Sequence, residues 1–334
     1  MIAAFIAGYG ADQVLKVGHF PEPKSNSSDI LVRVHAASVN PVDFKLRDGK
    51  FRLLRRYQFP LILGHDCAGE VGEVGEKVDR FKVGDRIFSR PRNGRIGTFA
   101  EFIAIDQSEA ALKPPNLSYH EAASLPLVGL TSWQALVDIA QLQPRQEILI
   151  HAGSGGVGTF AIQLAKHIGA KVWTTTSGRN LEFVKSLGAD HPINYENEDF
   201  EKRVNNLDVV FDTLGGDSLD KSFKVTRPNG WLVSISGSPD YRTAQEMGLD
   251  GVRTLLLRVV GLRVNAKAKK AAVNYRFIFM KPSGAELAQI ALLVAKGAIK
   301  PVVDRIFPIS ECQSAIEYSA SGRARGKVVI SVVD

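Results

Sequence analysis

The stretch Glu147-Ile148-Leu149-Ile150-His151-Ala152-Gly153-Ser154-Gly155-Gly156-Val157-Gly158 decides the fold. Its apolar first half predicts a buried strand, and its second half has the spacing Gly153-x-Gly155-x-x-Gly158. In such a loop the first glycine allows a tight turn, the second lets the backbone approach a pyrophosphate, and the third lets a helix pack on the strand. The free N–H groups at the start of that helix then face the anion. The stretch therefore predicts a dinucleotide site.

Strands and helices alternate after this loop. Gly169 ends the first helix, and a second helix is predicted at Leu181–Leu187. The further predicted strands are Lys171–Thr176, Ile193–Tyr195, Leu207–Thr213 and Trp231–Ser236. Residues 245–273 are predicted to form either an apolar helix or a lid. This order of elements is typical of an α/β protein with a doubly wound parallel sheet.

The first part of the chain has a different pattern. Glycines recur at short spacing between short apolar runs, which indicates a small β-barrel or sandwich. Ser118 and Glu121 predict the capping box of a first helix. Val302–Phe307 and Lys327–Val332 are predicted strands that return to the first domain. We therefore expect one domain formed by residues 1–118 and 282–334, and a second formed by residues 119–281.

Composition excludes several classes of protein. No apolar run approaches the roughly 20 residues of a membrane span, and the first residues lack the basic start of a signal peptide. We expect a cytoplasmic protein without a membrane partner. Cys67 and Cys312 are too few for a disulfide scaffold or a multi-cysteine zinc site, and both are expected to be buried. The net charge of +7 is dispersed, which indicates a solvated basic surface and makes nucleic acid an unexpected partner.

The end of the second predicted strand bears on the type of cofactor. An NAD site usually has Asp or Glu here to bind the ribose 2′-hydroxyl, but no carboxylate occurs between Thr176 and Asn180. Thr176 and Ser177 provide hydroxyls, and Arg179 provides a planar guanidinium suited to a phosphate. These residues predict NADPH. The alternative is that Arg179 is an ordinary surface residue of a turn.

The order and spacing of several motifs resemble the medium-chain dehydrogenase/reductase superfamily over nearly the whole chain. The motifs are Asn40–Asp43, Gly64–Gly69, Val83–Ile87, Gly97–Glu101, Leu127–Thr131, Ala152–Gly158, Gly297–Val302 and Gly322–Lys327. The resemblance implies a GroES-like β-barrel catalytic domain and a Rossmann coenzyme domain. It is strongest to the zinc-free quinone oxidoreductase branch. Within that branch, Asn180–Phe183 and Asn274–Met280 are similar to bacterial relatives of plant enone/quinone reductases and of the reticulon-4-interacting protein.

Zinc alcohol dehydrogenases of this superfamily bind catalytic zinc with Cys, His and a further Cys or Asp. The matching positions here are Asn40, His65 and Leu127. A catalytic zinc needs about three protein ligands, so the resemblance implies no metal, and His65 is expected to be structural. Without zinc, alcohol oxidation is disfavoured, and hydride transfer to a quinone or an α,β-unsaturated carbonyl is expected.

Roles are also expected for single residues, in part from the resemblance and in part from the chemistry of the reaction. Asn40 is expected to orient the acceptor oxygen or, alternatively, to bond local backbone; Tyr57 is a candidate proton donor, and Thr131 matches a threonine beside the nicotinamide. Tyr195 matches a 2′-phosphate ligand. The complete set of candidate cofactor-binding residues is Gly153, Ser154, Gly155, Gly156, Val157, Gly158, Thr176, Ser177, Arg179, Tyr195, Gly237, Phe279 and Lys327.

Other functions and an assembly remain open at this point. An enoyl-thioester reductase is an alternative enzyme, and an NADPH-binding sensor or structural protein with little turnover is an alternative of another class. Weak binding of single-stranded RNA is a third alternative. The family often dimerises through the sheet edges of the coenzyme domain, so a homodimer through residues near Val259–Val264 or Ser234–Ser236 is expected.

Overall fold

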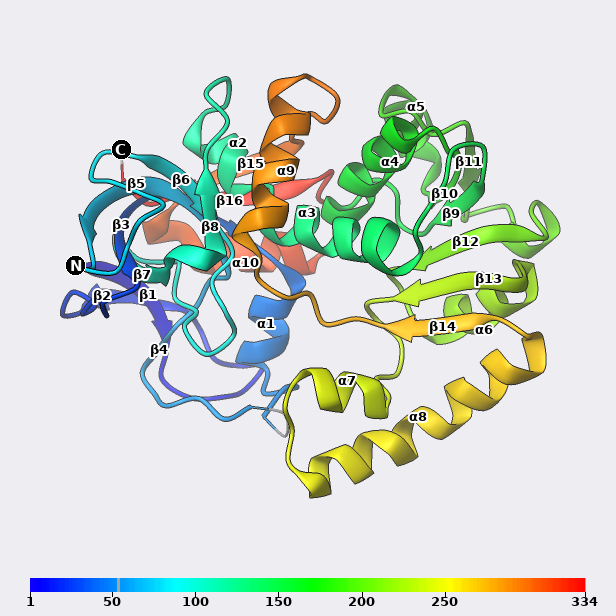
Figure 1. The fold of residues 1–334 in the computed structure, drawn as a ribbon, viewed down its shortest axis with the longest axis horizontal. Coiled ribbons are helices and arrows are strands. Elements are labelled where there is room, and N and C mark those ends of the chain that lie inside the picture. The colour runs from blue at the N-terminus through cyan, green and yellow to red at the C-terminus, as the bar shows by residue number, and fades with distance from the viewer. Residues whose placement is uncertain (53–54, 334) are drawn as a thin grey trace. The chain divides into compact units, whose positions relative to one another are not determined.

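A computed structural model describes residues 1–52 and 55–333, which form two compact units. The first unit comprises Met1–Leu130 and Lys281–Asp334, and the second comprises Thr131–Met280. Each unit has its own sheet or sheets (Figure 1). Each also has its own hydrophobic core.

The second unit is built on one six-stranded parallel sheet with the order β11-β10-β9-β12-β13-β14. The strands are β9 (Glu147–Ile150), β10 (Lys171–Thr176), β11 (His191–Asn194), β12 (Leu207–Asp212), β13 (Thr226–Ser234) and β14 (Asn274–Phe277). Strand order reverses beside β9, as in a doubly wound dinucleotide-binding sheet. The predicted α/β class and parallel sheet are confirmed.

Helices connect these strands. They are α4 (Gly156–Ile168), α5 (Leu181–Ser186), α6 (Gly216–Val225), α7 (Tyr241–Glu246) and α8 (Gly251–Ala271). α4 and α5 pack on β9, β10 and β11 (Figure 1). α6 packs on β12 and β13, and α8 contacts β14. Right-handed crossovers that wind outward in opposite directions place these two groups on opposite faces of the sheet.

The strand predicted at Trp231–Ser236 begins earlier, at Thr226, because residues 228–230 form an irregularity inside β13, where the pairing with β12 shifts register. The predicted dimer segments also differ from expectation. The predicted dimer residues Val259–Val264 lie on α8, and Ser234 ends an interior strand, so neither segment supplies the sheet edge. The edge strand on that side is β14.

The first unit has two mainly antiparallel sheets, ordered β2-β1-β4 and β15-β16-β3-β5-β6-β8, with β7 also paired to β3. The strands are β1 (Ile2–Ile6), β2 (Lys16–His19), β3 (Asp29–Val39), β4 (Leu61–Ile62), β5 (Asp66–Val74), β6 (Arg86–Ser89), β7 (Phe102–Asp106), β8 (Ala110–Leu112), β15 (Val303–Pro308) and β16 (Lys327–Ser331). Within the larger sheet, β3 is the central strand, because it pairs with β5, β7 and β16. The predicted return of the last strands to this unit is confirmed.

The helices of the first unit are α1 (Pro41–Arg47), α2 (Tyr119–Ala123), α3 (Pro126–Trp133), α9 (Gly284–Ala295) and α10 (Cys312–Ala320). The predicted capping box starts α2, because Glu121 N–H donates to Ser118 Oγ and Ser118 N–H donates to Glu121 Oε2. The unit extends to Leu130, beyond the expected boundary at residue 118, because α2 packs on β3 and β5.

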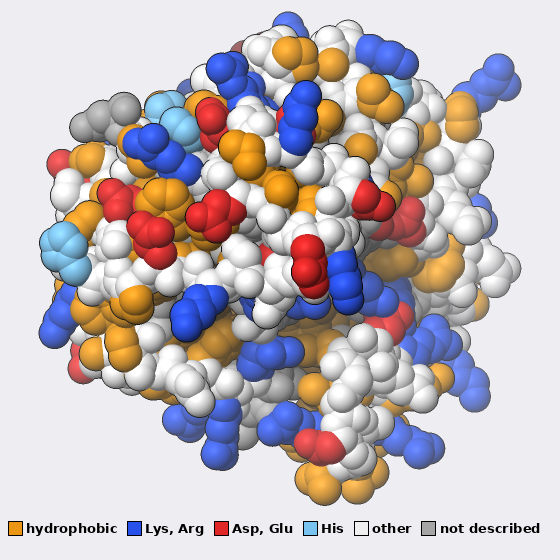
Figure 2. All heavy atoms as spheres, turned by 60° about the vertical axis from the view of Figure 1, so that its left-hand side comes forward, with side chains coloured by type: hydrophobic (Ala, Val, Ile, Leu, Met, Phe, Trp, Pro, Cys, Tyr) orange, Lys and Arg blue, Asp and Glu red, His pale blue; other side chains and the backbone are white. Residues whose placement is uncertain are grey.

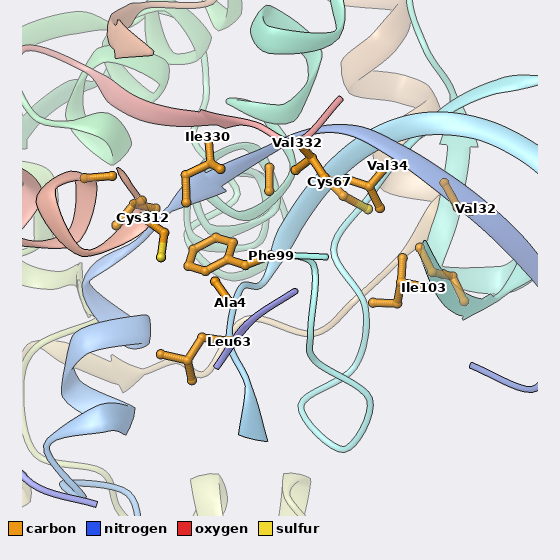
Figure 3. Close-up of a cluster of buried hydrophobic side chains, with 14 of the residues drawn as sticks. Ala4, Val32, Val34, Leu63, Cys67, Phe99, Ile103, Cys312, Ile330 and Val332 are labelled. Atoms are coloured by element: carbon orange, nitrogen blue, oxygen red, sulfur yellow. The ribbon is translucent and has the colours of Figure 1, made fainter. Parts of the chain in front are cut away.

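A buried hydrophobic cluster holds the first unit together (Figure 3). Phe99 and Leu63 lie in it with Cys67 and Cys312, so the prediction that both cysteines are buried is confirmed. Burial raises the pKa of the Cys312 thiol to about 11 and raises that of Cys67 further, so both remain protonated at neutral pH. Both thiols act as packed apolar groups.

The surface carries mixed charges. On the face drawn in Figure 2, Lys and Arg side chains are interspersed with Asp and Glu side chains, as the dispersed positions in the sequence predict. Among the residues that the structure describes, no helix has the length and hydropathy needed to cross a bilayer.

Candidate functional site

The glycine loop between β9 and α4 has the geometry that its sequence predicts. A Cβ on Gly153 would lie 2.1 Å from Thr174 Oγ1, and one on Gly158 would lie 2.3 Å from the carbonyl oxygen of Ala152. Close packing therefore requires both glycines. Gly155 differs, because a Cβ there would meet only the Ala152 oxygen, at 3.4 Å. The outer side of Gly155 is thus open to an approaching ligand, as the middle glycine of a dinucleotide loop requires.

Two neighbours fix this loop on the sheet. Gly153 N–H donates to the Thr175 carbonyl at 2.9 Å. The ring nitrogens of His151 each lie 3.1 Å from a hydroxyl, one from Thr175 and one from Ser222. Burial lowers the pKa of His151 to about 4, so the ring is neutral at neutral pH. The N–H groups of the first turn of α4, which have no acceptor within the helix, are consequently held in one position.

Four polar side chains gather where β10 ends. Ser154 Oγ accepts hydrogen bonds from Thr176 Oγ1 at 3.2 Å and from Asn180 Nδ2 at 3.1 Å. Asn180 Nδ2 also donates to Ser177 Oγ at 3.1 Å. The amide oxygen of Asn180 is buried and has no hydrogen-bond partner among the described residues. A buried acceptor without a donor is costly, and a ribose hydroxyl would satisfy it.

The predicted phosphate ligands lie at the same edge. Arg179 is an exposed residue of the turn that follows Ser177, and Tyr195, whose side chain is 62% exposed, follows β11. The Tyr195 N–H donates to the Thr176 carbonyl at 3.1 Å, which joins the ends of β10 and β11. Their roles as 2′-phosphate ligands stay predictions.

Glu196 brings a carboxylate to this edge that the sequence pattern did not indicate. Its Oε2 accepts a hydrogen bond from Gly178 N–H at 2.8 Å. The β10 segment itself contains no acid, but the loop after β11 supplies one from outside it. That carboxylate is therefore bonded to the backbone of the turn that contains Arg179.

The remaining predicted cofactor residues of the second unit lie at or beyond the carboxyl ends of strands. Gly237 follows β13; its N–H donates to Ser234 Oγ at 2.7 Å, and a Cβ there would lie 2.5 Å from Tyr275 Oη. Phe279 follows β14 and contacts Phe277 edge to face, with the ring centroids 5.1 Å apart. Ligands of doubly wound sheets bind beyond this edge, so Gly237 and Phe279 fit a dinucleotide site. Thr131, by contrast, is buried within helix α3.

In the first unit, a buried polar cluster centres on Asp66. Asp66 Oδ2 accepts from Ser38 Oγ at 2.7 Å and from Asn40 Nδ2 at 2.8 Å, and Oδ1 accepts from Leu127 N–H at 2.8 Å. Lys327 Nζ lies 3.4 Å from Asp66 Oδ2, and both side chains are buried. The cluster therefore contains an ion pair removed from solvent.

The ammonium group of Lys327 lies within hydrogen-bond distance of the side-chain oxygen of Asn40. Its ammonium donates to Asn40 Oδ1 and to the Val39 carbonyl, the latter at 3.0 Å, in addition to its contact with Asp66. Burial lowers the pKa of Lys327, and the negative charge of Asp66 opposes that shift. An ammonium has three protons, and three oxygens surround this one. This internal role differs from the predicted contact of Lys327 with cofactor, which stays a prediction.

The side-chain oxygen, the side-chain nitrogen and the backbone N–H of Asn40 all form hydrogen bonds within the protein. Its Nδ2 donates to the Ser38 carbonyl at 3.2 Å as well as to Asp66, and its backbone N–H donates to Asp43 Oδ2 at 2.7 Å at the start of α1. A direct bond from Asn40 to an acceptor oxygen would require one of these bonds to open. The alternative interpretation, an amide that bonds local groups, accounts for the contacts of Asn40.

His65 forms a buried pair with Asp43, with 2.6 Å between His65 Nδ1 and Asp43 Oδ1. The pair joins α1 to the residues before β5 and gives His65 a structural contact. In the described part of the chain, no group of three or more His, Cys, Asp or Glu side chains is placed to hold a metal ion.

Tyr57, the candidate proton donor, is partly buried. Its hydroxyl donates to the Asn93 carbonyl at 2.5 Å, and burial raises its pKa. The phenol is therefore protonated at neutral pH, with its proton directed to Asn93. A proton transfer to substrate would require the hydroxyl to turn from that carbonyl.

Comparison with known proteins places these two units together in one family. Residues 26–115 match the alcohol dehydrogenase GroES-like domain, and residues 187–330 match the zinc-binding dehydrogenase family. The mitochondrial NAD(P)H oxidoreductase RTN4IP1 of Danio rerio is 33% identical over 363 residues, covering 100% of this chain and 92% of that protein. The chain belongs to the medium-chain dehydrogenase/reductase superfamily.

Two further relatives locate it within the quinone oxidoreductase branch. The chloroplastic NADPH-dependent alkenal/one oxidoreductase of Arabidopsis thaliana is 33% identical over 341 residues, covering 99% of this chain and 79% of that protein. The solved structure of the quinone oxidoreductase from Coxiella burnetii has a TM-score of 0.86 and 33% identity, and the match covers 100% of this chain and 99% of that one. The predicted family, the GroES-like domain and the Rossmann sheet are confirmed. The chain is an oxidoreductase of a family that uses nicotinamide cofactors.

Sequence reasoning missed Asn180, Asp66 and Glu196. Asn180 lies in the predicted phosphate turn, so its amide is a signal that the sequence does contain. Asp66 lies beside His65 in the Gly64–Gly69 motif, but its partner Lys327 is too distant in sequence for a local pattern to reveal the pair.

The Asp66–Lys327 pair predicts a specific loss of stability. Replacing Lys327 with Met leaves the Asp66 carboxylate buried without its cation, which we expect to cost about 3 to 5 kcal/mol of unfolding free energy. The double variant Lys327→Met/Asp66→Asn should recover part of that loss. Urea denaturation measures both.

Lys171→Met is the matched control, because Lys171 pairs with Glu147 at 3.0 Å on the surface. An exposed pair contributes about 0 to 1 kcal/mol, so the control should change little. Equal effects of Lys327→Met and Lys171→Met would contradict a buried ion pair.

Proposed function

We propose that the protein is an NADPH-dependent, zinc-independent reductase that transfers hydride to a quinone or an α,β-unsaturated carbonyl compound. The observation that carries the proposal is the Lys327 ammonium among the oxygens of Val39, Asn40 and Asp66. Asn40 stands where zinc alcohol dehydrogenases have a metal ligand. In this protein the side-chain oxygen of Asn40 accepts a hydrogen bond from the Lys327 ammonium.

This arrangement favours some substrates over others. Alcohol oxidation needs strong stabilisation of an alkoxide, which a Lewis acid supplies. The ammonium of Lys327 is committed to three protein oxygens and is not a Lewis acid. A quinone or conjugated carbonyl needs less help, because its developing negative charge is delocalised. The protein then contributes position, exclusion of water and a few hydrogen bonds.

The residues at the carboxyl edge of the parallel sheet fit a dinucleotide. The open side of Gly155 and the first turn of α4 suit a pyrophosphate, and the unsatisfied oxygen of Asn180 suits a ribose hydroxyl. Thr176, Ser177, Arg179 and Tyr195 would surround a 2′-phosphate. When bound, NADPH supplies the hydride.

The other predicted residues would position the nicotinamide and supply the proton that the reduced substrate needs. Thr131 and Phe279 would border the nicotinamide. Tyr57 remains the candidate proton donor, because it carries a phenol proton at neutral pH. Asn40 holds the side chains of Asp66 and Lys327 in place through its hydrogen bonds with both, so its role is to position these groups. Solvent is the alternative source of the proton.

A panel of acceptors tests the reaction. NADPH oxidation is followed at constant protein concentration with a soluble quinone, a 2-alkenal and a crotonyl thioester. We expect turnover with the quinone or the alkenal and little with the thioester. Preference for the thioester would instead assign enoyl-thioester reduction. Tight NADPH binding without turnover of any acceptor would favour a sensor or structural role.

Arg179→Ala tests the choice of cofactor. Removing the guanidinium should weaken NADPH binding by about tenfold to a hundredfold, because a charge-assisted bond to phosphate is lost. NADH binding should change little. Fluorescence titration of both cofactors measures the two dissociation constants.

Arg227→Ala provides the control, because Arg227 lies near the amino end of β13, opposite the edge that carries the glycine loop. This variant should bind both cofactors like the parent protein. An equal loss of NADPH and NADH affinity in Arg179→Ala would remove Arg179 from the 2′-phosphate site.

A further inference from the structure

Helix α8 has an unusual composition. Its sequence, Gly251-Val-Arg-Thr-Leu-Leu-Leu-Arg-Val-Val-Gly-Leu-Arg-Val-Asn-Ala-Lys-Ala-Lys-Lys-Ala271, contains six basic residues and no acidic residue. Large aliphatic residues fill its first half, and lysines are concentrated near its end. In Figure 1 it is the long helix next to β14.

One face of α8 is committed to the protein. Leu257, Gly261, Val264 and Ala268 are buried and recur every three or four residues, so they lie on one side of the helix. Val264 and Ala268 belong to the core of the second unit. Contacts with α6, α7 and β14 hold this face in place.

The outward face of α8 is also apolar. Val252, the most exposed of these residues, has 80% of its surface accessible, and Leu255 has 61%. The other exposed large aliphatic residues of the helix are Leu256, Val259, Val260 and Leu262. Such a contiguous group is typical of an interaction surface, because scattered single residues are the usual exposed apolar groups. α8 thus has apolar residues on two faces, and only one contacts the core.

Basic side chains accompany the outward face. Arg258 and Arg263 lie among its aliphatic residues, and Lys269 and Lys270 follow in the last turn; within the described parts of the chain none of the four has an ion-pair partner. Arg253 and Lys267 do have partners, Asp250 and Asp220 respectively. At the lower edge of Figure 2, where Figure 1 places the start of α8, hydrophobic side chains lie with Lys and Arg side chains and an acidic one.

We propose that this outward face of α8 binds the surface of an anionic lipid bilayer, with the helix lying in the plane of the interface. Aliphatic side chains would enter the boundary between headgroups and acyl chains, and the arginines and lysines would bind lipid phosphates and carboxylates. The protein would be a peripheral binder, which departs from the sequence-based expectation of no membrane partner.

The charge of this face favours an anionic bilayer over a second copy of the chain as its binding partner. In a two-fold dimer the same patch would face itself. The unpaired Arg258 and Arg263 of one copy would then lie near those of the other, with no acidic residue on α8 to neutralise them. An anionic bilayer supplies the opposite charge together with an apolar layer. The face also has no aromatic residue on which nucleic-acid bases could stack.

Flotation with lipid vesicles tests the proposal. The full chain is mixed with vesicles of phosphatidylcholine alone or of phosphatidylcholine with about one third phosphatidylserine, at low and high salt. We expect about tenfold stronger binding to the anionic vesicles, with most of it lost at high salt. Equal binding to both vesicles, or no binding to either, would overturn the proposal.

Two pairs of substitutions locate the contact. Leu255→Asp/Val259→Asp removes part of the apolar face, and Arg258→Glu/Arg263→Glu reverses the charge beside it. Each pair should lower binding by about tenfold or more, because each removes one of the two contributions to interfacial binding. All four side chains are exposed, so the fold should be retained, which circular dichroism checks.

Lys82→Glu/Val83→Asp is the matched control on the first unit, where both side chains are exposed. It should bind vesicles like the parent protein, and an effect equal to that of the α8 variants would refute a specific α8 contact. Gel filtration tests the competing occupant. A dimer that Leu255→Asp/Val259→Asp dissociates, in a protein that does not bind vesicles, would assign this face to a second copy.

Discussion

The buried ion pair between Asp66 and Lys327 is the constraint on which the chemistry of the first unit depends. It joins β16 to the start of β5 and, through Asn40, to the start of α1. Two charges removed from water are tolerated only where hydrogen bonds satisfy them, and Ser38, Val39, Asn40 and Leu127 provide those bonds. The strands therefore converge on a fixed cation that belongs to the protein.

The dinucleotide edge of the second unit depends on a different constraint, which is the absence of side chains at the glycines of its loop. Gly153 and Gly158 bring the loop against β10 and α4, and Gly155 leaves the backbone accessible. Ser154, Thr176, Ser177 and Asn180 then form one hydrogen-bonded group at the sheet edge. Arg179, the proposed 2′-phosphate ligand, and Glu196 belong to the loops beside that group.

Local patterns in the sequence predicted local structure well. The bounds of β10 and the capping box of α2 follow from residue type and spacing, and the strand–loop–helix around Gly153 does as well. Contacts between distant segments were not predictable in this way. Lys327 and Asn40 are 287 residues apart, so no periodicity reveals their bond, and Glu196 reaches the phosphate turn from another loop. The role of α8 was left open because apolar residues on both faces give no single amphipathic stripe.

The central proposal is that this protein reduces its acceptor without a metal, with Asn40, at the position that matches a zinc ligand, bound instead to Lys327. The most direct measurement is the rate of NADPH oxidation with a quinone, before and after exhaustive treatment with a chelator, and again after zinc is added. The account predicts the same rate in all three states, because Lys327 already neutralises Asp66 and binds Asn40. Loss of activity on chelation with recovery on addition of zinc would contradict it.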